Sequence, residues 1–221
     1  MIKNKLKAIF FDFDGVLVES MGIKAEAFKY LFRNNTEHVK EIVDLHMKHG
    51  GMSRFEKFRI IYENVLKLPF NEKISEALNE KFSKFVYNRV IECPFVKGAE
   101  EFLVKYHKRL LFFIVSGTPQ HEMRNIAKAR KMNKYFKGIF GSPKHKNQLV
   151  REILEEFKIN LKNVLLIGDS IEDYEAAKKN RIKFVGRITE KGKDVFENLS
   201  INTVPDIIGF ESMLKKESLL E

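Results

Sequence analysis

The chain has 221 residues, of which 44% are apolar and 32% are charged, a balance typical of a globular protein rather than a disordered one. Its formal net charge of +10 would attract anionic partners, but Lys and Arg are mixed with Glu along the sequence, which argues against dedicated nucleic-acid binding. Cys93 is the single cysteine, which excludes an internal disulfide and fits a reducing cytoplasm, the expected location.

The first predicted element is the apolar run 7–12, which indicates a buried strand. Asp12 and Asp14 interrupt the apolar stretch behind the basic N-terminus, so a signal peptide is not expected. No apolar run in the sequence approaches the roughly 20 residues that cross a bilayer, so no membrane contact is expected.

An insert of helices follows the first strand. Residues 19–91 contain no convincing buried strand, and amphipathic segments take its place: 22–33, 37–48, 53–67 and 72–90. The sequence therefore predicts a four-helix cap at 19–91, and an α/β core made of residues 1–18 and 92–221.

The rest of the chain alternates between strands and helices. Short apolar runs predict four more strands: 110–116, 138–142, 163–170 and 182–188. Helical periodicity predicts the segments between and before them: 97–108, 120–132, 146–158 and 171–180. The fold class is therefore α/β, a doubly wound parallel sheet of Rossmann type, and the tail after about residue 205 carries no readable chemistry.

Polar residues follow three of these strands. Asp12, Ser116 and Asp169 each stand at the end of an apolar run. In open parallel sheets ligands bind beyond the carboxyl ends of the strands, so the three side chains are expected to converge on one edge.

Two carboxylates stand close together at the end of the first strand. Asp12 and Asp14 are followed by Gly15, which permits a tight turn. At about 4 Å and an effective dielectric near 20, two such charges repel by roughly 4 kcal/mol, and a divalent cation such as Mg²⁺ removes that cost. The alternative is an acidic turn exposed to solvent, which is the commoner origin of an isolated pair.

Taken together, the polar segments resemble the haloacid dehalogenase-like hydrolase superfamily. Its first signature reads Asp-x-Asp-Gly-(Val/Thr)-Leu, matched from Asp12 to Leu17. Its second is a Ser or Thr after the next core strand, matched by Ser116, and its third is a Lys farther along the chain. Its fourth, Gly-Asp-Ser-x-x-Asp, is matched from Gly168 to Asp173. The order is right, and the insert falls where members with a helical cap carry theirs.

The resemblance implies a role for each matched residue. Asp12 is expected to be the nucleophile that forms an aspartyl-phosphate, and Asp14 the general acid and then base. Ser116 and the backbone N–H of Gly117 would bind phosphoryl oxygens. The expected Mg²⁺ ligands are Asp12, Asp14 through its backbone carbonyl, Asp169 and Asp173.

Two lysines are candidates for the third signature. Lys144 and Lys146 both lie in the segment GSPKHKNQL, and the Pro precedes the first Lys, whereas many relatives read Lys-Pro. Lys146 is preferred because it opens the helix before the last signature and lies 23 residues before Asp169. Lys144 stays open as the alternative.

Two residues of the insert are candidates for binding substrate. Arg54 follows Gly50–Gly51 in a segment similar to a cap loop of sugar-phosphate mutases, and it would clamp a phosphate or carboxylate. The alternative is a simple helix start with Ser53 as the N-cap. Lys24 stands where several mutases and phosphatases of the family carry His, a departure that counts against mutase activity.

The sequence therefore predicts a magnesium-dependent phosphatase acting on a small phosphorylated metabolite, of the phosphoglycolate or sugar-phosphate type. A sugar phosphomutase of the same family is the alternative. A basic module that binds or processes nucleic acid is a more distant one, because the sequence groups no cations with aromatic platforms. The substrate and the oligomeric state are not readable from the sequence.

Overall fold

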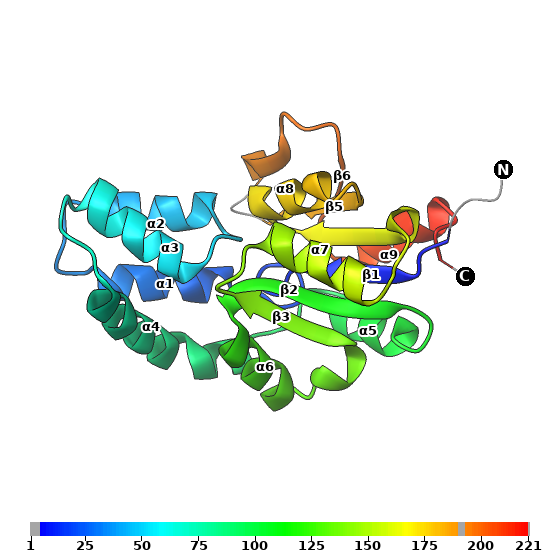
Figure 1. The fold of residues 1–221 in the computed structure, drawn as a ribbon, viewed down its shortest axis with the longest axis horizontal. Coiled ribbons are helices and arrows are strands. Elements are labelled where there is room, and N and C mark those ends of the chain that lie inside the picture. The colour runs from blue at the N-terminus through cyan, green and yellow to red at the C-terminus, as the bar shows by residue number, and fades with distance from the viewer. Residues whose placement is uncertain (1–4, 190–192, 221) are drawn as a thin grey trace.

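Among the residues that the computed structural model describes, 5–189 and 193–220, six parallel strands form one sheet in the order β3-β2-β1-β4-β5-β6. Figure 1 shows this sheet with helices on both sides and a group of helices beside one end. The strands are β1 (Ala8–Phe11), β2 (Leu111–Pro119), β3 (Gly138–Ser142), β4 (Val164–Gly168), β5 (Lys183–Arg187) and β6 (Asn202–Val204).

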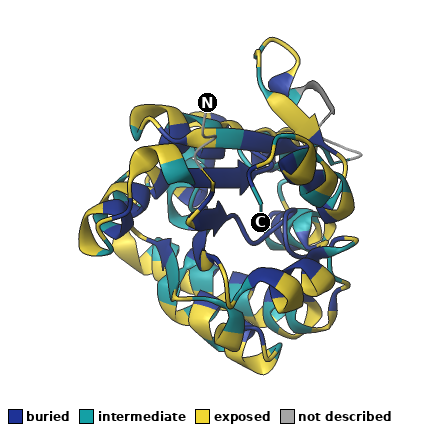
Figure 2. Ribbon diagram, turned by 90° about the vertical axis from the view of Figure 1, so that its right-hand side faces the viewer, coloured by how far each residue is buried: buried dark blue, intermediate teal, exposed yellow. Residues whose placement is uncertain are grey.

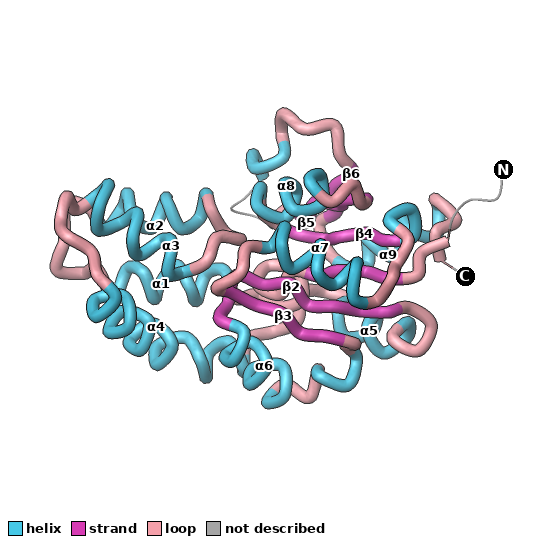
Figure 3. Tube along the Cα trace, in the orientation of Figure 1, coloured by secondary structure: helices cyan, strands magenta, loops and turns pink. Residues whose placement is uncertain are grey.

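Helices cover both faces of the sheet, as Figures 1 and 3 show. They are α5 (Ala99–Tyr106), α6 (Gln120–Ala129), α7 (Lys146–Glu156), α8 (Ile171–Lys179) and α9 (Ile207–Lys216), with short turns at η2 (Asn133–Tyr135), η3 (Leu161–Asn163) and η4 (Lys193–Phe196). Phe10 packs with α7 and α8, whereas Ile9 and Phe11 pack with α5, α6 and α9. Because successive side chains of a strand point to opposite faces, β1 must be apolar at every position.

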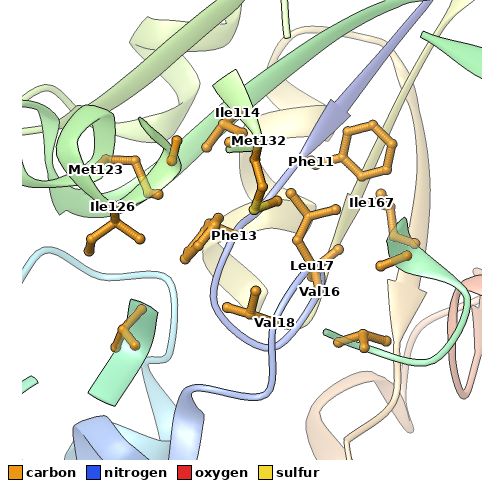
Figure 4. Packing of buried hydrophobic residues seen from close by; sticks show 14 of the residues in the cluster. Phe11, Phe13, Val16, Leu17, Val18, Ile114, Met123, Ile126, Met132 and Ile167 are labelled. Atoms are coloured by element: carbon orange, nitrogen blue, oxygen red, sulfur yellow. The ribbon is translucent and has the colours of Figure 1, made fainter. Parts of the chain in front are cut away.

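Burial is concentrated in the sheet, which appears in Figure 2 as dark strands enclosed by partly exposed helices. The loop that follows β1 is also buried: Figure 4 shows Phe13 beside Met123 and Ile126 of α6. Phe13 is fully buried between Asp12 and Asp14. The apolar residues of this loop therefore fix the backbone that carries both carboxylates.

Four helices lie beyond the end of β1. They are α1 (Met21–Leu31), α2 (Val39–Lys48), α3 (Arg54–Ile60), which continues as the π-helix η1 (Ile61–Val65), and α4 (Glu72–Glu92). The side chain of Ser53 accepts a hydrogen bond from the backbone N–H of Phe55 at 3.3 Å, so it caps α3. Asn71 caps α4 in the same way, through Ile74 N at 3.0 Å.

The doubly wound parallel sheet with inserted helices is confirmed, and the five expected strands are present. The sixth strand was missed, because β6 has three residues, two of them exposed, and pairs on one side only. The segment 53–67 is helical as expected but changes to a π-helix at Ile61. No helix of the described residues is long and apolar enough to span a membrane.

Candidate active site

The sheet brings the ends of its central strands together. Phe11 of β1 pairs with Ile114 of β2 and with Ile167 of β4, so the polar residues that follow these strands leave the sheet at the same edge. Carboxylate oxygens of Asp12, Asp169 and Asp173 lie within 4.8 Å of one another. Three residues that are far apart in the sequence therefore form one acidic cluster.

Lys146 joins this cluster at the start of α7. Its ammonium lies 2.7 Å from Asp12 Oδ2 and 2.6 Å from Asp173 Oδ1, and its side chain is buried. Although burial opposes the charge, these two carboxylates raise the pKa of Lys146 above its ordinary value. Lys144 instead pairs with Glu152 on the surface, with about half of its side chain (52%) exposed, so the structure places Lys146 at the site.

One ammonium does not balance three carboxylates, so full ionisation would leave the acidic cluster with two negative charges. Burial raises the pKa of Asp12 from 3.8 to about 7, and repulsion from Asp173 and Asp14 adds to the effect of lost hydration. Burial likewise raises the pKa of Asp169 well above its ordinary value, with repulsion from Asp12 next in importance. The cluster therefore stores unfavourable electrostatic energy that a divalent cation would release.

Asp14 has different surroundings from Asp12. Its Oδ1 accepts a hydrogen bond from Ser20 Oγ at 2.6 Å, and its Oδ2 accepts one from Thr118 Oγ1 at 3.1 Å. Lys24 Nζ donates to the same Oδ2 and lies 2.8 Å from Thr118 Oγ1. Although burial opposes ionisation, the charge of Lys24 and these hydrogen bonds lower the pKa of Asp14 below its ordinary value.

The last residues of β2 lie near the acidic cluster, since Gly117 and Thr118 line one small cavity with Asp12. Ser116 is buried, and its Oγ accepts a hydrogen bond from the backbone N–H of Thr118 at 3.1 Å. The backbone at Gly117 has room for no side chain, since a Cβ there would lie 2.7 Å from the carbonyl oxygen of Gly51. The strand end thus lies directly under the loop that joins α2 to α3.

That loop, residues 49–53, covers the site. A Cβ at Gly51 would lie 2.3 Å from Ser170 Oγ and 3.1 Å from Lys146 Nζ. Gly15, with φ of +74°, makes the turn below it, and a Cβ at that position would lie 2.1 Å from Asp169 Oδ2. Glycines on both sides let the two backbones approach the carboxylates closely.

Arg54 is at the site, but its charge is already paired. Its guanidinium makes two hydrogen bonds with the carboxylate of Glu122 in α6, at 3.0 and 2.5 Å, and a third with Ser83 Oγ at 2.8 Å. The residue is buried, so it does not extend into solvent. Arg54 lines the same small cavity as Asp12 and Asp14. Its ion pair with Glu122 joins the inserted helix α3 to the core helix α6.

Ser20, Thr118 and Lys57 also line or support the site, and the sequence analysis missed them. Thr118 stands two residues after Ser116, so the second signature held a usable signal. Ser20 lies just before α1 and reads as an ordinary helix start. Lys57 in α3 resembles many other lysines of this basic chain, and no sequence signal separates it from them.

The acidic cluster fits a magnesium ion. Its donors are carboxylate oxygens, which Mg²⁺ prefers, and Asp169 Oδ1 is buried without a hydrogen-bond partner among the described residues. Asp173 is more fully engaged, because its Oδ1 accepts from Lys146 and its Oδ2 accepts from Ser170 Oγ. Both oxygens of Asp12 are engaged as well, by the backbone N–H of Phe13 and by Lys146, so Asp169 is the member of the cluster with the most capacity left for a metal.

Comparison with known proteins agrees with this arrangement. The profile of a family described as haloacid dehalogenase-like hydrolase matches residues 9–187. A phosphorylated carbohydrates phosphatase of Thermotoga maritima is 26% identical over 200 residues, which cover 87% of this chain and 91% of that protein.

Solved structures show the same fold at lower identity. A hydrolase from Pseudomonas syringae superposes with a TM-score of 0.79 at 20% identity, covering 95% of this chain and 98% of that one. A β-phosphoglucomutase from Clostridium difficile superposes with a TM-score of 0.75 at 18% identity, covering 96% and 97%. The profile match over most of the length, together with the acidic cluster at the strand ends, shows that the chain belongs to the haloacid dehalogenase-like hydrolase family.

Proposed function

We propose that this protein is a magnesium-dependent phosphatase that hydrolyses a small phosphorylated metabolite through an aspartyl-phosphate on Asp12. The observation that carries the proposal is the acidic cluster with Lys146 inside it. Such a group combines a carboxylate nucleophile, a cation for the phosphoryl group and carboxylates for a metal in one buried place. A purely structural role would not concentrate so much uncompensated charge.

Asp12 is the proposed nucleophile. Its Oδ1 is held by the backbone N–H of Phe13 at 2.7 Å, and its Oδ2 by Lys146 at 2.7 Å, so the carboxylate is fixed in orientation. Attack on phosphorus forms the Asp12–phosphate bond and releases the alcohol. Water then breaks the acyl-phosphate and releases inorganic phosphate.

Asp14 is the proposed acid and base. It would give a proton to the departing oxygen and take one from the attacking water. Lys24 favours the ionised form of Asp14, which suits the second step. The first step requires a protonated carboxyl, so Lys24 is expected to move when the leaving group binds.

Asp12, Asp169 and Asp173, with the backbone carbonyl of Asp14, are the proposed magnesium ligands. When bound, the ion shields the anionic phosphoryl group from the attacking carboxylate. Ser116 Oγ, the N–H of Gly117 and the ammonium of Lys146 would bind the phosphoryl oxygens as negative charge builds on them. Asp173 additionally positions Lys146, at 2.6 Å.

We assign residues 1–18 and 92–221 to a catalytic core and 19–91 to a cap that selects the substrate. The relative from Thermotoga maritima, named for phosphorylated carbohydrates, supports a substrate of that size. Lys24 at the position of the family's His favours hydrolysis over phosphoryl transfer to a sugar, so the phosphomutase remains the second candidate. Nucleic-acid partners and membranes are not expected, and a cytoplasmic location stays a prediction.

A panel of phosphorylated metabolites assayed for phosphate release tests this proposal. With Mg²⁺, the wild-type chain is expected to hydrolyse some of them, and Asp12→Asn to lower kcat by at least about a thousandfold. Asp44→Asn, the same change at an exposed position of α2, is the matched control and should leave kcat unchanged. Equal turnover by the Asp12 variant, or isomerised product without free phosphate, would contradict the proposal.

A further inference from the structure

Lys57 is a buried cation that the reaction does not use. It lies in α3 with 2% of its surface exposed. Its ammonium lies 3.0 Å from His46 Nδ1, 3.4 Å from the carbonyl oxygen of Gly50 and 5.9 Å from the ring centre of Phe28. The imidazole, the carbonyl group and the phenyl ring carry no negative charge, so none of them balances the positive charge of the Lys57 ammonium.

The other cations around the site each have a carboxylate partner. Lys24 pairs with Asp14, Arg54 with Glu122, and Lys146 with two carboxylates of the acidic cluster. Within the described part of the chain, no carboxylate oxygen lies within 4.0 Å of Lys57 Nζ. A buried ammonium without an anion is strongly unfavourable, and an anion that binds from outside the protein would remove that cost.

His46 fixes the direction of this ammonium. Its ring stacks on Phe28 with centres 4.7 Å apart, and its Nδ1 accepts the hydrogen bond from Lys57. Burial, and then the charge of Lys57, lower the pKa of His46 well below its usual value, so the imidazole is neutral and acts as an acceptor. Burial lowers the pKa of Lys57 to about 7, with the charge of Lys24 as the next cause.

Lys57 and the reacting carboxylates share one cavity. Asp12, Asp14 and Lys57 line it, and Phe28 and Phe82 supply apolar walls. Its volume is about 20 Å³ with the loop 49–53 in place, which is the space of a single water. Because Asp12 and Lys57 line the same small cavity, the group that lies at Lys57 must be compact.

We propose that Lys57 is a specificity-determining residue whose ammonium binds the carboxylate of a short phosphorylated acid, the phosphoryl group of which lies at Asp12. This inference rests on the proposed function and narrows its substrate class from phosphorylated metabolites in general to phosphorylated carboxylic acids. The two anionic ends of such a molecule would match the acidic cluster with its metal at one end and Lys57 at the other.

Binding measured without turnover tests the inference. Phosphoglycolate and 2-hydroxyethyl phosphate differ only in a carboxylate in place of a hydroxymethyl group. In the Asp12→Asn background with Mg²⁺, calorimetry should show phosphoglycolate binding at least tenfold more tightly. Adding Lys57→Met should abolish that preference and leave the affinity for 2-hydroxyethyl phosphate within about threefold.

Lys73→Met is the matched control, because it removes the same charge from an exposed position of α4. It should leave the preference intact. Equal affinity of the two probes, a preference that survives Lys57→Met, or no binding of either probe would overturn the inference. Failure of the phosphatase proposal is separate, since it appears as absent phosphate release by the wild-type chain.

Two further readouts exclude a merely structural role. In the active enzyme, Lys57→Met should raise KM for phosphoglycolate tenfold or more and change kcat much less. The variant should also melt at a higher temperature than the wild type without ligand, because a buried uncompensated charge is removed. A lower melting temperature with parallel losses for both substrates would show that Lys57 only supports the fold.

Discussion

Lys146 is the cation at the centre of the acidic cluster. Its ammonium contacts Asp12 and Asp173 together, and all three side chains are nearly inaccessible to solvent. Removing one member of a buried ion pair leaves its partner uncompensated, which costs far more than an exposed pair contributes. The residue therefore serves stability and chemistry at once.

Lys146→Met should lower kcat by about a thousandfold or more and destabilise the metal-free fold by about 3–5 kcal/mol, since two buried carboxylates lose their cation. Urea unfolding and phosphate release measure the two effects. Lys144→Met is the control: it breaks an exposed pair with Glu152 and should change stability by less than about 1 kcal/mol. Comparable losses in both variants would contradict the assignment of Lys146.

The sequence predicted which residues meet in the acidic cluster better than it predicted the partners of the surrounding cations. The positions of Asp12, Asp169 and Lys146 follow from strand ends and spacing, and the structure brings them together. Arg54 was expected to meet a ligand, but its pairing with Glu122 depends on how α3 packs against α6, which no local pattern encodes. Lys57 was missed for the same reason, because burial of a lysine is a property of the packed structure.

At the scale of elements, the loop between α2 and α3 is the part of the inserted helical segment that approaches Lys146 and Ser170. Gly51 approaches Ser170 and Lys146, and its carbonyl oxygen lies against Gly117. Met52 and Gly117 line both the small cavity over Asp12 and a larger one, of about 190 Å³, beside α7 and α8. The loop therefore separates the reacting groups from that larger cavity.

Gly51→Ala should hold the loop away from the site, because the added methyl group would lie 2.3 Å from Ser170 Oγ. We expect kcat/KM to fall at least about tenfold, as imperfect closure admits water and misplaces the substrate. Gly22→Ala is the control: nothing lies within 4 Å of its added carbon, and alanine favours the helix. Steady-state kinetics of both variants test this prediction. An unchanged kcat/KM for Gly51→Ala would mean that closure of the loop 49–53 does not limit the reaction.

Strands were predictable where their residues form continuous apolar runs, and less so elsewhere. The strands at the centre of the sheet are apolar on both faces, which is why their runs stand out. β6 consists of Asn202, Thr203 and Val204 at an edge, and only its pairing with β5 defines it. The π-helix at Ile61–Val65 likewise depends on tertiary packing, since its residues suit an ordinary helix.

At the scale of the whole molecule, a basic chain contains an acidic centre. The formal net charge is +10, yet three carboxylates meet a single ammonium in the acidic cluster. An overall positive field of this kind attracts anions, and a local excess of carboxylates favours the binding of a cation. These two fields act over different distances, so they do not cancel.

The acidic cluster links stability to pH. The folded-state pKa of Asp12, about 7, exceeds its ordinary value of 3.8, so the folded chain holds more protons than the unfolded one between these two pH values. The contribution of Asp12 to the free energy of unfolding therefore falls as pH rises through this window, and Asp169 contributes in the same direction. A bound divalent cation offsets the loss, because it favours the ionised carboxylates that high pH produces.

Mg²⁺ should accordingly raise the melting temperature more at pH 8 than at pH 5, where protons compete for the carboxylates. At a concentration about a hundred times its Kd, the gain at pH 8 should be about 2.7 kcal/mol, or roughly 5–10 °C for a chain of this length. NaCl at equal ionic strength controls for screening, and Asp169→Asn should reduce the Mg²⁺ response by removing a buried carboxylate oxygen that has no other partner. The pKa of Lys57, about 7, lies near the same range. Lys57 contributes equally to the melting temperatures with and without Mg²⁺, so the difference between these two temperatures reports on the acidic cluster. An equal rise in melting temperature at both pH values, or a rise that NaCl reproduces, would contradict the binding of Mg²⁺ by these carboxylates.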